Sequence, residues 1–228
     1  MTGTPGERLR VAVLISGSGS NLQALMDAAA ADRIPVDIVA VVSDRADAYG
    51  LERAHTAGIP AVCLPGKDFD RRADFDAALG TRLASLAPDR VVLAGFMRIR
   101  TDELVAAWHG RMLNIHPSLL PAYRGLHTHR RVLEAGDAEH GTSVHFVTPE
   151  LDGGPIVAQA RLSVEAGDDE QSLNRRIQAM EHRLYPEVVG WYGVGRLRLE
   201  GERVLLDDVP LTRPVQRREE ALLRPAEA

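Results

Sequence analysis

An asparagine and a histidine stand two positions apart at the end of an apolar run, as Asn114-Ile115-His116. On an extended strand, residues two apart point to the same face, so the carboxamide and the imidazole would lie side by side. Such a pair can donate hydrogen bonds to a carbonyl oxygen on which charge develops. An aspartate folding back on the imidazole would keep the ring charged near neutral pH. These residue types therefore indicate chemistry on a carbonyl group.

The candidate for that aspartate is Asp152, in the turn Leu151-Asp-Gly-Gly-Pro155. Spacing alone does not pair Asp152 with His116, and an acid in such a turn also suits a local Asx-turn. Pro117 restricts His116 to an extended backbone, which fixes the direction of the imidazole. A core histidine with a satisfied hydrogen bond is the alternative, but the nearby Asn114 favours a functional site.

A glycine loop, Gly17-Ser-Gly-Ser-Asn21, follows an apolar run and opens a helical pattern. Glycines let the backbone approach a phosphate, and the helix N-terminus offers free N–H groups. Leu22 stands where the dinucleotide fingerprint has its third glycine, and the loop lacks the lysine of a P-loop. The loop thus favours a single phosphate group. A tight strand-to-helix turn capped by serine and asparagine explains the same residues equally well.

Strands and helices alternate along the first half of the chain. The pattern predicts an α/β fold with an open, mainly parallel twisted sheet and helices on both faces. Ligands in such sheets bind beyond the carboxyl ends of the strands, where the polar loops of this chain fall. The predicted strands are 11–15, 36–42, 61–64, 90–94 and 112–115, and the predicted helices are 22–31, 48–57, 69–86 and 101–108.

The pattern changes after residue 140. We expect strands 142–147 and 156–162, antiparallel or mixed, on either side of the turn 149–155. A long helix is expected over 168–191 and a hairpin over 196–206. The tail from Pro214 is charged and rich in alanine, which suits either a loose helix or disorder.

Composition excludes several classes of function. The 228 residues carry a net charge of −5, so the chain lacks the basic footprint of a nucleic-acid-binding protein. Cys63 is the only cysteine, which rules out an internal disulfide and argues against a cysteine-based zinc site. No apolar run has the length of a membrane span, and residues 1–10 lack a signal-peptide core. We therefore expect a soluble, cytoplasmic protein with no membrane, nucleic-acid or metal partner. Polar loops explain four histidines better than a metal site does, namely His127, His129, His140 and His145.

Taken together, these segments resemble the folate-dependent glycinamide ribonucleotide formyltransferases of purine synthesis. The similarity extends from about Arg10 to about Asp208. The Asn-x-His and Leu-Asp-Gly-Gly pieces are shared by the wider formyl-folate family, whereas the glycine loop and the piece Glu181-His182…Tyr185-Pro186 are similar to this family in particular. The other matching segments are Gly50-Leu-Glu-Arg-Ala54, Leu93-Ala-Gly-Phe-Met-Arg-Ile99, Gly125-Leu-His-Thr-His129 and His140-Gly-Thr-Ser-Val-His145.

The resemblance implies a formyltransferase fold with a Rossmann-like N-terminal half. It also implies transfer of a formyl group from the co-substrate 10-formyltetrahydrofolate to the amine of 5-phosphoribosylglycinamide, without a metal. The implied domain spans 10–208, with a phosphate-binding half over 10–110 and a catalytic and folate-binding half over 111–208. Residues 1–9 would be a flexible N-terminus and 209–228 a C-terminal tail. The substrates are small molecules, and both a monomer and a homodimer stay open.

Residue roles follow from the same resemblance. Asn114, His116 and Asp152 would be catalytic. The 5′-phosphate would be held by Gly19, Ser20 and Asn21, and the ribose by Glu181. A flexible cover would run through His127 and His129. The folate site would be lined by Arg72, Met97, Arg98, Ile99, Arg100, Asn114, Leu151 and Asp152.

Two residues depart from the family pattern. Arg100 stands where relatives often have an aliphatic residue, which is harmless if this stretch contacts the pterin through its backbone. Arg124 stands where some relatives have proline, and its side chain would either reach an anion or face solvent.

Other functions remain to be compared with this one. A formyl-folate hydrolase would use the same three catalytic residues with water as acceptor. Family hydrolases carry an N-terminal regulatory domain and methionyl-tRNA formyltransferases a C-terminal RNA-binding domain, and we expect neither here. A non-catalytic phosphate-binding module would use the glycine loop alone. An NAD-dependent oxidoreductase is disfavoured by the missing third glycine.

Overall fold

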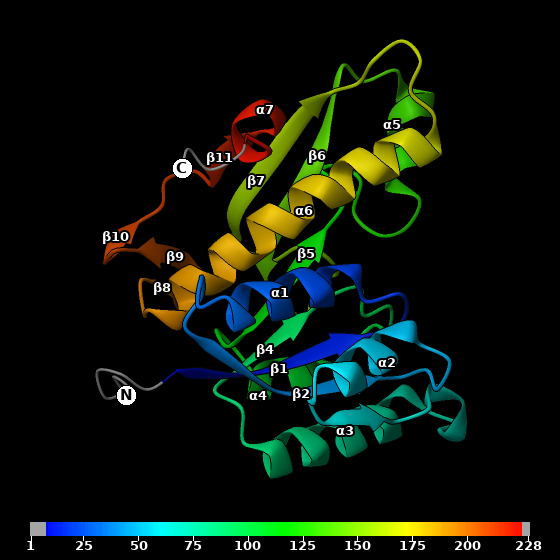
Figure 1. Cartoon of the computed structure of the whole chain (residues 1–228), viewed down its shortest axis with the longest axis vertical. Coiled ribbons are helices and arrows are strands. Elements are labelled where there is room, and N and C mark those ends of the chain that lie inside the picture. The colour runs from blue at the N-terminus through cyan, green and yellow to red at the C-terminus, as the bar shows by residue number, and fades with distance from the viewer. Residues whose placement is uncertain (1–7, 225–228) are drawn as a thin grey trace.

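The computed structural model describes residues 8–224, which form an eight-stranded sheet, a small three-stranded sheet and surrounding helices (Figure 1). The larger sheet has the strand order β11-β7-β6-β5-β4-β1-β2-β3. Its strands are β1 (Leu9–Ile15), β2 (Val36–Ser43), β3 (Ala61–Cys63), β4 (Arg90–Leu93), β5 (Met112–His116), β6 (Glu139–Phe146), β7 (Ile156–Ser163) and β11 (Val215–Arg218).

The main helices are α1 (Ser20–Ala30), α2 (Tyr49–Thr56), α3 (Arg72–Leu86), α4 (Asp102–Ala107), α5 (Thr128–Ala135) and α6 (Glu170–Gly193). A 3₁₀ turn, η1 (Gly66–Asp68), precedes α3, and a short helix, α7 (Glu219–Leu222), follows β11. The second sheet consists of the hairpin β8 (Leu197–Glu200) and β9 (Arg203–Leu206) with β10 (Val209–Pro210).

Most neighbouring strands in the larger sheet are parallel, which confirms the predicted fold class. Strands β3, β2, β1, β4 and β5 run the same way, and only β6 is antiparallel to its neighbours β5 and β7. The chain passes from β1 outward to β2 and β3, then returns to form β4 on the other side of β1. This reversal creates a crevice at the carboxyl ends of β1 and β4, where ligands bind in such sheets.

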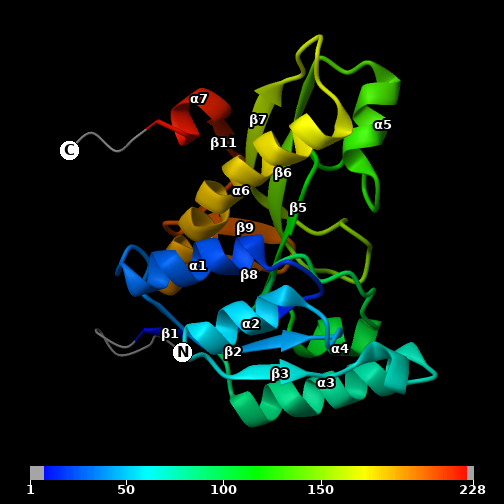
Figure 2. The ribbon, with the colours of Figure 1, turned by 45° about the vertical axis from the view of Figure 1, so that its right-hand side comes forward.

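Helices cover both faces of the sheet (Figures 1 and 2). One core joins the sheet to α1 and α6, with Leu22, Leu25, Leu184 and Val188 fully buried. The opposite core joins it to α3 and α4. Because parallel strands are buried on both faces, they read as continuous apolar runs, which is why β1 and β4 were recognisable in the sequence.

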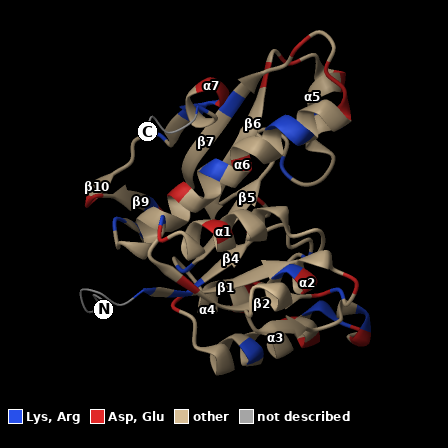
Figure 3. Ribbon diagram, viewed as in Figure 1, with Lys and Arg blue, Asp and Glu red and all other residues tan. Residues whose placement is uncertain are grey.

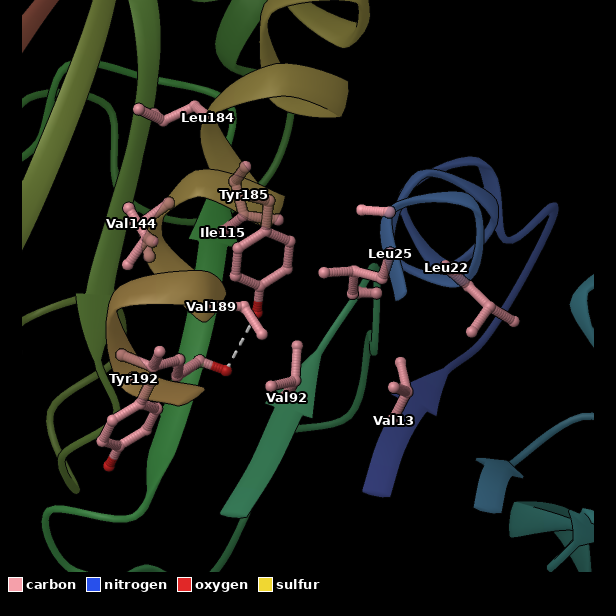
Figure 4. Close-up of a cluster of buried hydrophobic side chains, with 14 of the residues drawn as sticks. Val13, Leu22, Leu25, Val92, Ile115, Val144, Leu184, Tyr185, Val189 and Tyr192 are labelled. Atoms are coloured by element: carbon pink, nitrogen blue, oxygen red, sulfur yellow. Dashed lines mark hydrogen bonds between the residues drawn. The ribbon is translucent and has the colours of Figure 1, made fainter. Parts of the chain in front are cut away.

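Tyr185 anchors the long helix α6 on the sheet. Its buried ring packs among aliphatic side chains from α1, α6 and the strands (Figure 4). The hydroxyl donates to the carbonyl of Leu93 at 2.8 Å and lies 3.2 Å from the carbonyl of Leu113. Burial raises the pKa of this phenol well above its usual value, so it remains a donor. This contact fixes the position at which α6 crosses β4 and β5.

Three expectations need correction. The flexible loop expected through His127 and His129 ends at His127, because the helix α5 begins at Thr128 and includes His129. The predicted flexible N-terminus of 1–9 is too long, because Leu9 pairs with β2 and Arg8 donates to the carbonyls of Ala29 and Val36; residues 1–7 lie outside the described range. The predicted tail of 209–228 contains an edge strand, β11, which pairs in parallel with β7.

Side-chain contacts explain this edge strand. Gln216 accepts hydrogen bonds from Arg161, and Glu219 accepts two from Arg176. None of these long-range pairings is visible in a charged, alanine-rich sequence. Within residues 8–224, no helix is long and apolar enough to cross a membrane.

Candidate active site

The crevice at the carboxyl ends of β1 and β4 is closed by backbone contacts between two loops. The amide of Ser16 donates to the carbonyl of Gly95 at 3.1 Å, and the Ser16 hydroxyl accepts from the amide of Met97 at 2.9 Å. These bonds hold the start of the glycine loop beside the segment 97–100. Both segments were predicted as site residues, and the fold brings them together.

The glycine loop is shaped by a close approach to α2. Gly19 has a left-handed backbone (φ 69°), and a Cβ there would lie 2.7 Å from the Cα of Gly50. The amide of Gly50 donates to the carbonyl of Gly17 at 3.1 Å. Gly19 therefore has to be glycine for two reasons, conformation and space. The loop delivers Ser20 and Asn21 to the first turn of α1, whose N–H groups face the crevice end.

Glu181 links the glycine loop to the end of strand β5, where His116 lies. It is buried on α6, one turn before Tyr185. Its carboxylate accepts from Asn21 Nδ2 (2.8 Å) and Thr142 Oγ1 (3.1 Å). Burial raises the pKa of Glu181, and these two hydrogen bonds oppose that shift. Thr142 also lies within hydrogen-bond distance of the His116 carbonyl (2.9 Å), so one polar network spans α1, α6 and β5.

His116 is the last residue of β5, at the strand end where the sequence placed it, and its side chain is buried. Its Nε2 lies 3.0 Å from the carbonyl oxygen of Tyr123, and its Nδ1 lies 3.4 Å from Oδ2 of Asp152. Both neighbours are hydrogen-bond acceptors, so both ring nitrogens are matched when each carries a proton. The fold therefore brings Asp152 to the imidazole across the sheet, from a turn that spacing alone could not pair with it.

The turn that carries Asp152 is held by its own backbone geometry. Asp152 has a left-handed backbone (φ 48°), and its Oδ2 accepts from the amide of Gly125 at 3.0 Å. A Cβ on Gly154 would lie 1.9 Å from the Phe146 carbonyl oxygen. The left-handed backbone of this turn falls on Asp152 and on neither glycine, whereas Gly154 is required for close packing against β6.

His145 joins this group, although the sequence placed it among polar loop residues. It lies opposite Asn114 in the antiparallel pairing of β5 and β6 and is buried. Its Nδ1 lies 2.9 Å from the Phe146 carbonyl, and its Nε2 lies 3.1 Å from Asn114 Nδ2. Burial lowers the pKa of His145, which favours a neutral ring. Nδ1 then carries the proton and Nε2 accepts from Asn114.

This contact fixes the orientation of the Asn114 amide. Because Nδ2 donates one hydrogen to His145, its second hydrogen is free to reach another acceptor. The role of His145 follows from the register of β5 against β6, which places it opposite Asn114. The sequence of one strand does not reveal that register.

Exposed apolar side chains flank the same centre. Met97, Ile99 and Leu151 are 63%, 51% and 44% exposed, and Leu126 is 60% exposed. Isolated exposed apolar residues are ordinary, but Leu151 adjoins Asp152, Leu126 follows Gly125, whose amide donates to Asp152, and Met97 and Ile99 belong to the segment held beside the glycine loop. They suit one face of a flat aromatic ligand. Three of the four belong to residues that the sequence assigned to folate binding.

The remaining predicted folate residues have distinct settings. Arg98 stacks over the Phe75 ring at 4.3 Å and packs against Gly66. Arg72 is exposed at the start of α3, one turn before Phe75, and no contact joins it to the other site residues within the described chain. Arg100 donates to the Arg98 carbonyl at 2.8 Å, while its Nε is buried without a partner among residues 8–224. Burial lowers the pKa of Arg100, and the carboxylates of Asp152 and Asp76 oppose this.

Two histidines expected in a polar loop are buried instead. His129 lies on α5, and its Nδ1 is 2.9 Å from His140 Nε2 on β6. Asn174 Nδ2 lies 3.3 Å from His129 Nε2. The amide donates, so His129 donates in turn to His140, and both rings are neutral. The prediction of a polar loop was therefore wrong, because helix formation turns His129 inward.

Arg124, the second residue that departs from the family pattern, forms an ion pair with Glu150.

These features are those of an enzyme. An amide, an imidazole and a carboxylate gather at the strand ends, and a glycine loop opens a helix beside them. A family model described as formyl transferase matches residues 9–189. The chain belongs to the formyl transferase family.

Named relatives agree with this assignment. The chain is 53% identical to the phosphoribosylglycinamide formyltransferase of Escherichia coli over 199 residues, covering 87% of this chain and 94% of that protein. The structure of the phosphoribosylglycinamide formyltransferase of Coxiella burnetii matches with a TM-score of 0.88 at 47% identity, covering 92% of this chain and all of that one. A formyltetrahydrofolate deformylase of Pseudomonas syringae shares the fold, with a TM-score of 0.81 at 24% identity.

Proposed function

We propose that this chain transfers the formyl group of 10-formyltetrahydrofolate to the glycinamide amine of 5-phosphoribosylglycinamide, in purine biosynthesis. The observation that carries this proposal is the meeting of Asn114, His116 and Asp152 beside a glycine loop suited to one phosphate. The similarity to the phosphoribosylglycinamide formyltransferases of Escherichia coli and Coxiella burnetii supports it.

The two ring nitrogens of His116 have different tasks in this proposal. Nε2 anchors the ring through the Tyr123 carbonyl at 3.0 Å. The 3.4 Å between Nδ1 and Asp152 exceeds the usual range for an N–H···O hydrogen bond, so this proton is not fully engaged. Nδ1 is therefore the nitrogen that donates to the formyl oxygen, while the ring stays in place.

Asn114 supplies the second donor. Its amide orientation is set by His145, which leaves one N–H for the formyl oxygen. Two donors placed in advance stabilise the charge that develops there as the amine attacks, and each is worth on the order of 100- to 1,000-fold in turnover. His145 is a positioning residue here, because it acts through Asn114.

Asp152 completes the group as a charged partner for the imidazole. Its Oδ2 is fixed by the Gly125 amide, and its Oδ1 lies 3.7 Å from His145 Nε2. A neutral His145 with its proton on Nδ1 cannot donate to Asp152, so the carboxylate is directed at His116. It orients the ring, and it can take a proton, through water, from the attacking amine and pass it to the folate nitrogen that leaves.

Substrate binding uses the opposite ends of the crevice. The first turn of α1 at Gly19, Ser20 and Asn21 holds the 5′-phosphate, and Glu181 accepts from a ribose hydroxyl in place of one of its present donors. The exposed apolar residues Met97, Ile99 and Leu151 receive the pterin ring, with Arg72 and the backbone of 97–100 at the edge of that site. The folate supplies an activated formyl group, and the protein supplies position and electric field.

The test is a formyl-transfer assay with the purified chain. With 10-formyltetrahydrofolate and 5-phosphoribosylglycinamide together, we expect formylated ribonucleotide and tetrahydrofolate in equal amounts by mass spectrometry and absorbance. Without the ribonucleotide, formyl loss should stop. Formyl release that continues at the same rate without the ribonucleotide would instead identify a hydrolase.

A further inference from the structure

The proposed phosphate loop carries no positive charge of its own. Gly17 to Asn21 contains only glycine, serine and asparagine, and the lysine of a P-loop is missing. Helix N–H groups provide only partial charge for a phosphate dianion. A nearby cation would strengthen this site considerably, because hydrogen bonds to charged groups are the stronger ones.

Arg53 on α2 lies against this loop. A Cβ on Gly19 would lie 3.5 Å from the Cδ of Arg53, so the side chain runs across the glycine. Its Nε donates to the Ser18 carbonyl at 2.8 Å, and its Nη1 donates to Gln23 Oε1 at 3.0 Å. The guanidinium also stacks over the Tyr49 ring at 4.9 Å. These three contacts hold a cation at the edge of the loop, and among residues 8–224 no carboxylate forms an ion pair with it.

A hollow of about 470 Å³ opens beside the same loop, between α1 and α6. Ser20 and Arg53 line one end of it, and His182 lines its α6 wall. Basic residues on α2 and α6 lie on either side of α1 (Figure 3). The Nε2 of His182 is buried and has no hydrogen-bond partner within the described chain. Buried polar atoms normally form a hydrogen bond, and a ligand oxygen or a water molecule in the hollow would provide one for this nitrogen.

We infer that Arg53, assisted by His182, supplies the positive charge and side-chain donors of the phosphate subsite, so that these residues select a phosphorylated over an unphosphorylated glycinamide riboside. This inference rests on the proposed function and adds the residues that read the phosphate charge. Arg53 has two tasks: it braces the loop through Ser18 and Gln23, and its remaining N–H groups face the anion. Burial and the neighbouring Arg183 and Arg53 lower the pKa of His182, so the free imidazole is neutral and serves as a hydrogen-bond donor or acceptor.

The test compares two substrates, 5-phosphoribosylglycinamide and its dephosphorylated riboside, on the wild-type chain and on Arg53→Met. We expect the variant to lose roughly 10- to 100-fold in kcat/KM for the phosphorylated substrate, mostly through KM. Activity on the riboside should fall far less, because only the brace of the loop is lost there, and KM for the folate should stay unchanged. Inorganic phosphate should inhibit the wild type and inhibit the variant much less.

Controls separate charge from structure. Arg53→Lys keeps the charge and should retain most of the preference for phosphate, whereas Arg82→Met, at an exposed position on α3 away from this hollow, should change nothing. His182→Asn should weaken the preference by a smaller factor. Equal losses on both substrates in Arg53→Met would overturn the inference and leave only a bracing role. Absence of formyl transfer by the wild type would count against the proposed function and not against this subsite, which phosphate binding by calorimetry in wild type and Arg53→Met still tests.

Discussion

The carboxylate of Asp152 lies 3.4 Å from Nδ1 of His116, although the two residues belong to a turn and a strand end that spacing does not connect. Both side chains are only 8% exposed. Because water is largely excluded from this site, a carboxylate interacts with an imidazolium far more strongly there than it would in water. The pair thus couples the orientation of the ring to its charge.

Asp152→Asn should therefore reduce kcat by about 100- to 1,000-fold while KM for the ribonucleotide changes by less than about threefold. The amide keeps the shape of the turn but cannot hold a protonated ring. Glu150→Gln is the matched control, since Glu150 sits in the same turn, is 65% exposed, and pairs with Arg124 instead. Steady-state kinetics beside calorimetry of ribonucleotide binding provide the measurement. Near-normal turnover in Asp152→Asn would remove Asp152 from the mechanism.

The glycine loop offers a comparison between two neighbouring glycines. Gly19→Ala places a Cβ 2.7 Å from the Gly50 backbone at a left-handed position, whereas a Cβ on Gly17 meets nothing within 4 Å. Since misplacement by about 1 Å can cost on the order of 100-fold, Gly19→Ala should raise KM for the ribonucleotide at least about 10-fold. Gly17→Ala should stay close to wild type. KM for the folate should be unchanged in both variants, and equal losses for the two substrates would contradict the phosphate assignment.

Local sequence predicted the parts of the fold that local rules determine. Apolar runs identified β1, β2 and β4. The helix predicted over 101–108 is α4, and Thr101 is its N-cap, with a hydroxyl that accepts from the Leu104 amide. Proline and strand periodicity placed Asn114 and His116 on one face. These features depend on neighbours within a few positions, which is why they could be read from one sequence.

Long-range pairings could not be read in the same way. The position of His145 opposite Asn114 depends on the register of β5 with β6. The edge strand β11 depends on contacts to β7 and to Arg176, far away in the chain. The inward face of α5 emerges only when His129 meets His140. In each case contacts between residues far apart in the sequence determine the local structure, and the sequence of a polar segment does not reveal those contacts.

The His129–His140 pair should make stability depend on pH. Burial, and to a lesser degree the nearby His129 and His116, lowers the pKa of His140 from 6.5 to about 4, and the pKa of His129 is lowered as well. Between pH 6.5 and 4 the unfolded chain binds a proton that the folded chain does not. Stability should therefore fall as the pH falls through this window, by up to about 3 kcal/mol for His140.

Chemical denaturation at several pH values checks this dependence. His140→Leu leaves a donor of His129 unpaired and is expected to be less stable at pH 7, so the slopes of stability against pH are compared rather than the absolute values. The variant should show a clearly shallower slope between pH 6.5 and 4. His55→Leu, at an exposed position on α2, serves as the control and should keep the wild-type slope. Identical slopes in wild type and His140→Leu would exclude the pair as the source.

Arg100 should be a destabilising residue that does not bind the folate through its side chain. Its Nε is buried without a partner in residues 8–224, and its Nη1 is taken by the Arg98 carbonyl. Replacing a poorly paired buried charge with an apolar side chain of similar length is often stabilising, so Arg100→Met should raise the free energy of unfolding by about 1 kcal/mol. KM for the folate should change by less than about threefold, because the backbone of the segment is unaltered. Arg98→Met is the contrasting control: it removes the stacking over Phe75 and should lower stability by about 1 kcal/mol. A large rise in folate KM for Arg100→Met would show instead that this guanidinium contacts the ligand.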